Sequence, residues 1–199
     1  MKNIIKSIAA VALLSTLGFI AAGPAAEAAT VQVAMEGFSF SPQNVKAGQG
    51  STVTWTDMDN AQHTSTSDQL FWQSSHLSMN QTFSETTTFK NAGIYSYVCE
   101  IHSFMTGQVR VPLIAKGSAT AGWTIRWSSL SSTPNNRAFD VQLKRPGSTK
   151  WESYRANTSA RSSFFNPTRT GDYGFRARTR NLSNGEFSAW SPALTVTIS

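Results

Sequence analysis

The sequence is poor in residues that cross-link a chain or gather metal ions in clusters. Its 199 residues include one cysteine, Cys99, and three histidines. A lone cysteine excludes a disulfide within the chain, and three histidines are too few for an oxidase that holds several clusters of metal ions. No apolar run beyond residue 22 reaches the roughly 20 residues that a membrane-spanning helix needs. We therefore expect neither a disulfide scaffold nor an enzyme.

The N-terminus has the features of a secretion signal. Two lysines precede an apolar run over residues 8–22, which has the length of a signal-peptide core. Ala26 and Ala28 then flank Glu27, and this fits the small-x-small rule for cleavage. We predict a signal peptide over residues 1–28, cut after Ala28, and a periplasmic or secreted protein. A retained membrane anchor is the alternative, although the run is short for a bilayer of about 30 Å.

The rest of the chain alternates as β-strands do and divides into two parts. Apolar or aromatic residues recur at every second position, for instance at Val53 and Trp55. Small residues interrupt the pattern over residues 113–121, and this predicts a linker. The sequence therefore predicts an all-β protein with one β-sandwich over residues 29–112 and a second over residues 122–199.

The two parts also differ in charge. Residues 29–112 carry three basic and six acidic side chains, whereas residues 113–199 carry twelve basic and four acidic ones. The whole chain has a formal net charge of +6, so the excess of positive charge belongs to the second part. Such asymmetry is typical of two domains with different surfaces and partners.

Potential metal ligands lie close together near the end of the first part. Cys99, His102 and Met105 follow a predicted strand and share one short loop. A thiolate and a thioether, together with two imidazoles, make the ligand set of type 1 copper. Zinc normally recruits more thiolates or carboxylates and does not choose a thioether. The second imidazole has to come from His63 or His76, the two remaining histidines.

Residues 30–112 resemble the cupredoxins, with the ligand-loop spacing of their amicyanin and plastocyanin branch. The shared motifs are Phe38-Ser39-Phe40-Ser41-Pro42, Val53-Thr54-Trp55, His63-Thr64 and the loop from Cys99 to Met105. The resemblance implies a Greek-key β-sandwich with one type 1 copper ion at one end and one-electron transfer as the activity. It also implies that the histidine after the tryptophan strand is a ligand, and this selects His63 over His76. The implied ligands are His63, Cys99, His102 and Met105.

One position departs from the family pattern. Thr64 stands where these proteins usually have asparagine after the first histidine ligand. We expect the hydroxyl of Thr64 to donate a hydrogen bond toward the cysteine loop in place of the amide. A change beside the ligands alters the environment of the thiolate, so it affects the reduction potential more than the choice of metal.

The resemblance also implies where a redox partner binds. In the family the second loop histidine, here His102, reaches the surface inside an apolar patch through which electrons pass. Candidates for that patch are Ile101, Phe104, Phe38 and Phe40, although a position in the core is the favoured interpretation for Phe38 and Phe40. A redox protein is therefore expected to dock near His102. The same ligands leave two other functions open, namely copper delivery without a redox partner and a copper-containing adhesion or matrix-binding module.

Residues 122–199 resemble a fibronectin type III domain. The resemblance rests on Trp127, on the strand that begins at Tyr173 and on the motif Ser188-Ala189-Trp190-Ser191-Pro192. It implies a second, immunoglobulin-like β-sandwich in which Tyr173 is the corner tyrosine. Three arginines then fall on one outer face by the period of two along a strand. They are Arg176, Arg178 and Arg180.

This arginine row has two interpretations. It is expected either to bind an anionic polymer or an acidic partner, or to be a solvated strand face with stacked guanidinium groups. The second part contains no histidine and no cysteine. The sequence therefore assigns it no catalytic or metal-binding site and leaves its ligand open.

Overall fold

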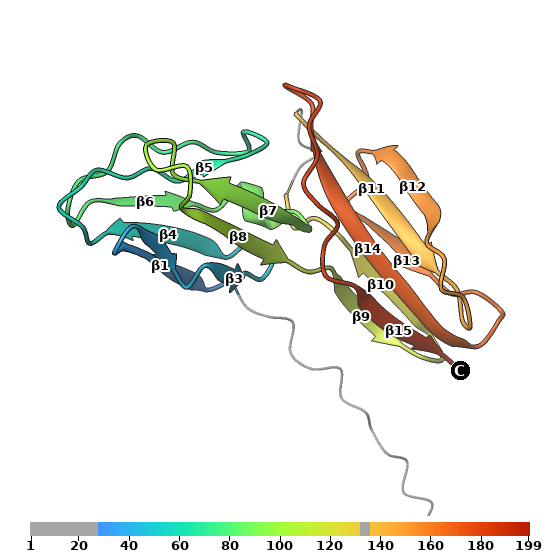
Figure 1. Ribbon diagram of the computed structural model, residues 1–199. Coiled ribbons are helices and arrows are strands. Elements are labelled where there is room, and N and C mark those ends of the chain that lie inside the picture. The colour runs from blue at the N-terminus through green and yellow to red at the C-terminus, as the bar shows by residue number, and fades with distance from the viewer. Residues whose placement is uncertain (1–27, 132–135) are drawn as a thin grey trace, which may run out of the picture.

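The computed structural model describes residues 28–131 and 136–199, and most regular structure in these two ranges is β-strand (Figure 1). A short 3-10 turn, η1, covers Thr88–Lys90. The predicted signal peptide, apart from Ala28, lies outside the described residues. Within the described ranges no helix is long and apolar enough to cross a membrane. The predicted all-β fold class is confirmed.

The first sandwich consists of two four-stranded sheets. One has the order β2-β1-β4-β6 and the other β3-β8-β7-β5. The pairs β1–β4 and β3–β8 are parallel, so the chain crosses between sheets before it returns to the neighbouring position. The strands are β1 (Thr30–Glu36), β2 (Ser39–Ser41), β3 (Asn44–Lys46), β4 (Thr52–Asp57), β5 (Thr66–Ser67), β6 (Thr82–Glu85), β7 (Gly93–Val98) and β8 (Thr106–Val111).

Alternation along the strands builds the core of this sandwich. In β4 every second residue is buried, so Val53 and Trp55 point inward. Trp55 is completely buried and stacks on Trp72, with ring centroids 5.6 Å apart. Tyr97 on β7 meets Trp55 edge-on at 5.4 Å. Each large side chain buried in this way contributes about 1.5–3 kcal/mol, and the packed rings fix the ends of β4 and β7 relative to each other.

The second sandwich packs a three-stranded sheet, β13-β10-β9, against a four-stranded one, β12-β11-β14-β15. Its core includes Trp127, Phe139 and Phe175, none of which is exposed. The hydroxyl of Tyr173 donates to the carbonyl of Arg169 at 2.8 Å, as a corner tyrosine does. The strands are β9 (Ile114–Ser118), β10 (Gly122–Arg126), β11 (Arg137–Lys144), β12 (Glu152–Thr158), β13 (Ser162–Phe165), β14 (Gly171–Asn181) and β15 (Leu194–Ile198).

The linker predicted over residues 113–121 is wrong. Most of this segment is strand β9, which pairs antiparallel with β10 along its whole length, and Leu113 is buried in the second core. The small side chains suggested a flexible connection, but backbone groups form a ladder whatever the side-chain size. Gly117 lies opposite Trp123 with a φ of 145°, a conformation that glycine adopts without strain. The second sandwich therefore begins near residue 113 instead of residue 122.

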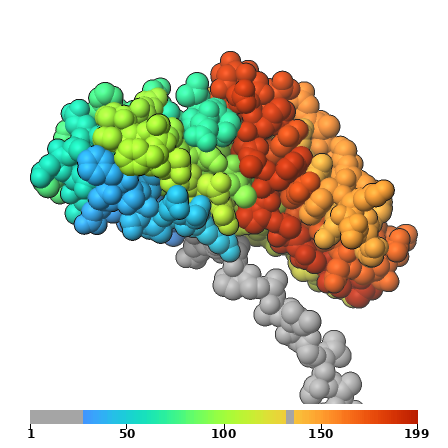
Figure 2. Space-filling model, viewed as in Figure 1, coloured from blue at the N-terminus to red at the C-terminus, as the bar shows by residue number. Residues whose placement is uncertain are grey.

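The two sandwiches are joined directly, and Figure 2 shows the C-terminal part of the chain, in red, packed against the first sandwich. The backbone N–H of Ala92 donates to the carbonyl of Trp127 at 2.8 Å. The buried hydroxyl of Tyr95 lies 3.1 Å from the Thr179 hydroxyl of β14. These contacts lie where β7 begins. Cys99 follows the other end of β7, about 20 Å away at the usual rise of a strand.

Candidate metal centre

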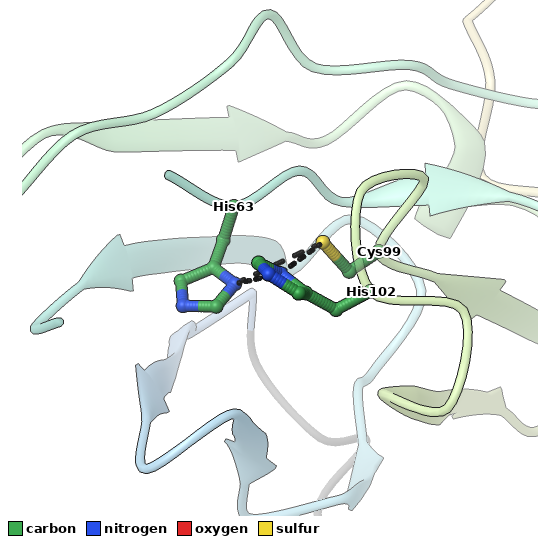
Figure 3. Close-up of side chains that lie close together, drawn as sticks. All are labelled: His63, Cys99 and His102. Carbon is green, nitrogen blue, oxygen red and sulfur yellow. Dashed lines mark hydrogen bonds between the residues drawn. The ribbon is translucent and has the colours of Figure 1, made fainter. Parts of the chain in front are cut away.

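Three potential ligands meet (Figure 3), at the pole of the first sandwich that lies away from the junction. Cys99 directly follows β7, and His102 lies in the loop between β7 and β8. His63 comes from the segment between β4 and β5. Backbone bonds close the cysteine loop, since the N–H of Cys99 donates to the carbonyl of Met105 at 3.1 Å and the N–H of Met105 donates to that of His102 at 2.9 Å. The fold thus brings together residues that are 36 and 39 positions apart.

The donor atoms form a small triangle. The sulfur of Cys99 lies 3.8 Å from Nδ1 of His63 and 3.7 Å from Nδ1 of His102, and the two nitrogens lie 3.2 Å apart. A triangle with these sides has its centre about 2.1 Å from each corner, close to the usual length of a bond from a first-row metal to nitrogen or sulfur. One thiolate and two imidazoles at this spacing are the trigonal set of type 1 copper. The residues therefore fit one copper ion.

The structure separates the two candidate histidines. His63 is completely buried and lies beside Cys99, whereas His76 is exposed and does not belong to the cluster. Met105 is buried, with 2% of its surface exposed, and lies in the loop that carries His102. Its role as a fourth ligand stays a prediction.

Hydrogen bonds stabilise the thiolate form of Cys99. The backbone N–H of Thr64 donates to the sulfur at 3.4 Å. Burial alone raises the pKa of Cys99, but this bond, together with those to His63 and His102, lowers that pKa to about 7. A cysteine binds a metal ion as the thiolate. The hydrogen bonds at this site therefore favour the metal-binding form of Cys99 in the metal-free protein.

Thr64 connects the two ligand segments in a way that differs from our expectation. Its hydroxyl accepts a hydrogen bond from the backbone N–H of Glu100 at 2.8 Å, whereas we expected it to donate. The donor toward the sulfur is the backbone N–H of the same residue. The carboxylate of Glu100 is bound by the side-chain amide of Gln73 at 3.1 Å. The threonine therefore ties the cysteine loop to the His63 segment through both its backbone and its side chain.

Asp59, a position that matches the family pattern but was given no role from the sequence, binds the far side of His63. Its Oδ2 lies 2.9 Å from Nε2 of His63. Backbone N–H donors of Phe38 and Gly37, with a smaller contribution from His63, hold the pKa of Asp59 below its ordinary value. Burial lowers the pKa of His63, but the bonds to Cys99 and Asp59 outweigh it and the pKa is raised. An acid four residues before a ligand histidine was the available sequence signal.

Apolar side chains surround the exposed edge of His102. Ile101 and Phe104 are 42% and 71% exposed, as the resemblance implied for patch residues. Phe40 is buried as expected, but Phe38 is 45% exposed, and its ring lies 4.9 Å from the ring of His102. Phe38 is therefore a surface residue beside the ligands and was wrongly expected to lie in the core. The turn between β1 and β2, which the pattern did not resolve, carries it outward.

The arginine row of the second sandwich is stacked between aromatic rings. Arg176 lies over Trp190 at 4.9 Å, and Arg178 lies over the same ring at 4.8 Å. Arg178 also pairs with Asp140 at 2.8 Å, while Arg180 lies over Phe187 at 5.2 Å. Such stacking is attractive by itself. Binding of an anionic polymer or acidic partner at this row stays a prediction.

Comparison with known proteins identifies the first sandwich. The family model of the cupredoxin-like domain matches residues 7–111. No curated protein matches the chain. Among solved structures, a copper-containing nitrite reductase from Thermus scotoductus SA-01 is 26% identical, with a TM-score of 0.39, over 41% of this chain. The chain spans only 22% of that reductase.

Two small copper proteins are similar to the same extent. A purple cupredoxin from Nitrosopumilus maritimus is 26% identical, with a TM-score of 0.38, over 41% of this chain and 98% of its own. The Cu(I) form of an amicyanin variant is 28% identical, with a TM-score of 0.39, over 41% of this chain and 81% of its own. The cofactor that fits the centre is one type 1 copper ion. Because the family model covers more than half of the 199 residues, the chain belongs to the cupredoxin-like domain family.

Proposed function

We propose that the protein is an exported one-electron carrier whose copper is held by His63, Cys99, His102 and Met105. The observation that carries this proposal is the convergence of the thiol and two imidazole nitrogens within 3.2–3.8 Å of one another. Cupredoxins are generally electron carriers, and many are periplasmic or secreted. The second sandwich is proposed to be fibronectin type III-like, supported by its three-plus-four strand order and by the bond of Tyr173 to Arg169.

The chain's own residues prepare the site for rapid electron transfer. Copper, when bound, supplies a one-electron couple between its cupric and cuprous states. His63 and Cys99 are completely buried and tied to Asp59 and Thr64, so little in the protein has to rearrange when the charge changes. Met105 is proposed to give a weak fourth bond from its buried position in the loop. A rigid, preformed ligand set keeps the reorganisation small.

Electrons are proposed to enter and leave through His102. Its side chain is partly exposed, and Phe38, Ile101 and Phe104 form an apolar patch around it. A patch of this kind suits the small, transient interfaces of redox partners. The acidic excess of residues 29–112 would attract a basic partner. The second sandwich contacts the opposite pole, so it leaves this patch accessible.

Voltammetry of the mature, copper-loaded protein tests the proposal. We expect a reversible one-electron wave, a strong absorption band toward the red in the oxidised protein, loss of that band with dithionite and its return with ferricyanide. Replacement of Phe104 by Ala should slow electron exchange with a redox protein and leave the potential almost unchanged, because the ring lies at the surface. A copper-loaded protein without a reversible wave would rule out the carrier function.

A further inference from the structure

One carboxylate holds two separate segments of the chain together at the metal centre. Oδ1 of Asp59 accepts a hydrogen bond from the backbone N–H of Gly37 at 2.9 Å. Oδ2 accepts from the backbone N–H of Phe38 at 3.0 Å and lies 2.9 Å from Nε2 of His63. The side chain of Asp59 is 16% exposed, so these contacts are partly shielded from water. Asp59 therefore connects the turn between β1 and β2 to a ligand imidazole.

The contact with Asp59 fixes the orientation of the His63 ring. Nε2 points away from Cys99, while Nδ1 faces Cys99 and His102 (Figure 3). A carboxylate at Nε2 favours the tautomer with the proton on that nitrogen and leaves the lone pair of Nδ1 free for a metal. An unanchored imidazole could rotate about its bond to the chain and turn Nδ1 away. The carboxylate thus selects both the ring position and the donor atom.

The same carboxylate holds Phe38 over the ligands. Gly37 and Phe38 have φ values of 57° and 55°. The left-handed region is costly for a bulky residue such as phenylalanine, and the bond from its N–H to Asp59 stabilises it there. The Phe38 ring meets the rings of His63 and His102 at 5.5 and 4.9 Å, in both cases edge-on. The ring therefore lies between the two imidazoles and solvent.

We propose that Asp59 is a positioning residue that retains copper, because it holds the His63 imidazole and the Phe38 ring as one unit. The inference rests on the proposed function as a carrier, because a carrier has to keep its copper ion through many turnovers. Asp59 is the residue that slows the loss of that ion. Loss of the carboxylate frees both parts at once. The imidazole gains rotational freedom, and the turn that keeps Phe38 over the site loses both of its hydrogen bonds.

Replacement of Asp59 by Asn tests this role, because it keeps the size and removes one of the two acceptor oxygens. Transfer of copper from Asp59→Asn to an excess of a soluble chelator should be about 10- to 100-fold faster than from the unmodified protein. In the metal-free state, hydrogen exchange should also become faster at whichever of the Gly37 and Phe38 amides faces the new NH2 group. Phe38→Leu keeps the carboxylate and should leave the Gly37 amide protected, with a smaller gain in copper release.

Glu36→Gln is the matched control. Glu36 is an exposed acid beside the same turn, and its side chain is not bonded to His63, so the variant removes the same charge without breaking the unit. It should release copper at the rate of the unmodified protein. Thermal unfolding of the metal-free variants identifies any that fails to fold. In that event Asp59→Ser, which retains one acceptor, replaces the asparagine variant.

Copper release at the unmodified rate from a folded Asp59→Asn protein, with both amides still protected, overturns the inference. An equal acceleration in Glu36→Gln also overturns it, since charge alone would then account for the effect. Failure of the carrier function gives a different result, namely no reversible wave in the unmodified protein. Metal release and hydrogen exchange, measured again with cobalt(II) in place of copper, test the role of Asp59 independently of the voltammetric wave.

Discussion

In the first sandwich buried polar groups converge on one pole, whereas in the second partly exposed polar groups pair with one another along a sheet. His63, Thr64 and Cys99 are all completely buried, and their donors are directed at one another. In the second sandwich Arg178 is paired with Asp140 and Arg176 with the side chain of Gln142 at 2.8 Å. Each of these guanidinium groups already has a partner and a ring against it.

The difference shows how one architecture supports two roles. Potential ligand atoms that converge within 3.2–3.8 Å of one another indicate metal binding. Paired and stacked groups satisfy one another, so they indicate stability and a stiff surface. The junction through Tyr95 and Thr179 joins the two without touching the metal centre. The first sandwich is therefore expected to bind an ion at one pole, whereas the polar side chains of the second sandwich are expected to stabilise its sheet.

The largest effect is expected from Cys99→Ser. A hydroxyl does not replace a thiolate as a ligand of type 1 copper, so the intense colour should be lost completely even where copper still binds. The visible spectrum after copper addition measures this. The corresponding loss of Arg178 in the second sandwich should leave the colour intact. A coloured Cys99→Ser protein would show that the sulfur is not a ligand.

A second effect concerns the pH dependence of the metal-free protein. The pKa of Cys99 is lowered from 9.0 to about 7 in the folded state. Between these values the unfolded chain binds more protons at this group than the folded one. The free energy of unfolding should therefore rise with pH from about 7 to about 9, and this contribution should be lost as the pH falls through about 7.

Urea unfolding of the metal-free protein and of Cys99→Ala, each at the two ends of that range, isolates the contribution of the thiol. The difference in stability between the two proteins should grow toward the alkaline end. A difference that does not change with pH would mean that the folded protein leaves the pKa of the thiol at its ordinary value, and the thiolate would then not be favoured before copper binds.

The junction should give a moderate effect. Tyr95→Phe removes a buried hydroxyl that lies 2.9 Å from the carbonyl of Asn91 and 3.1 Å from the hydroxyl of Thr179. We expect the free energy of unfolding to fall by about 1 kcal/mol, with no change in the visible spectrum of the copper form. Urea unfolding followed by tryptophan fluorescence measures the loss. A change in colour would mean that the junction reaches the metal centre.

The smallest effect is expected for anion binding by the arginine row. Arg176, Arg178 and Arg180 are stacked on aromatic rings. A triple change to Ser removes three positive charges from this face. Retention of this variant on an anionic polymer should fall only by the amount that the lower net charge causes, with no further loss from a specific site.

A second triple variant provides the control for net charge. It changes three arginines that lie elsewhere on the second sandwich, namely Arg145, Arg155 and Arg169. We expect the two triple variants to lose retention equally. A collapse of retention in the row variant alone would establish the row as the site for an anionic polymer.

The sequence predicted the metal centre better than the domain boundaries, for a physical reason. Thiol, imidazole and thioether are rare side chains, so their spacing in Cys99, His102 and Met105 carried strong information. The boundary failed because β9 is held by backbone bonds, and a run such as Ala115 to Ser118 shows no side-chain pattern that reveals them. The family match and the cofactor are confirmed, whereas the full ligand set is untested.

The groups around the ligands were harder to predict. Asp59 is one acid among eleven acidic residues in the chain, and only the folded turn brings it to Nε2 of His63. A core position was favoured for both Phe38 and Phe40 because aromatic side chains are usually buried, and only Phe40 is buried. Phe38 has a left-handed backbone in the turn between β1 and β2, and its ring lies at the surface. Tertiary contacts of this kind leave little trace in a single sequence.

X-ray absorption at the copper edge of the oxidised, copper-loaded protein tests whether one sulfur and two imidazole nitrogens bind the ion. We expect one short bond from copper to sulfur and two bonds to imidazole nitrogen, with one copper ion per chain. A copper surrounded only by nitrogen and oxygen, with no sulfur neighbour, would contradict this prediction.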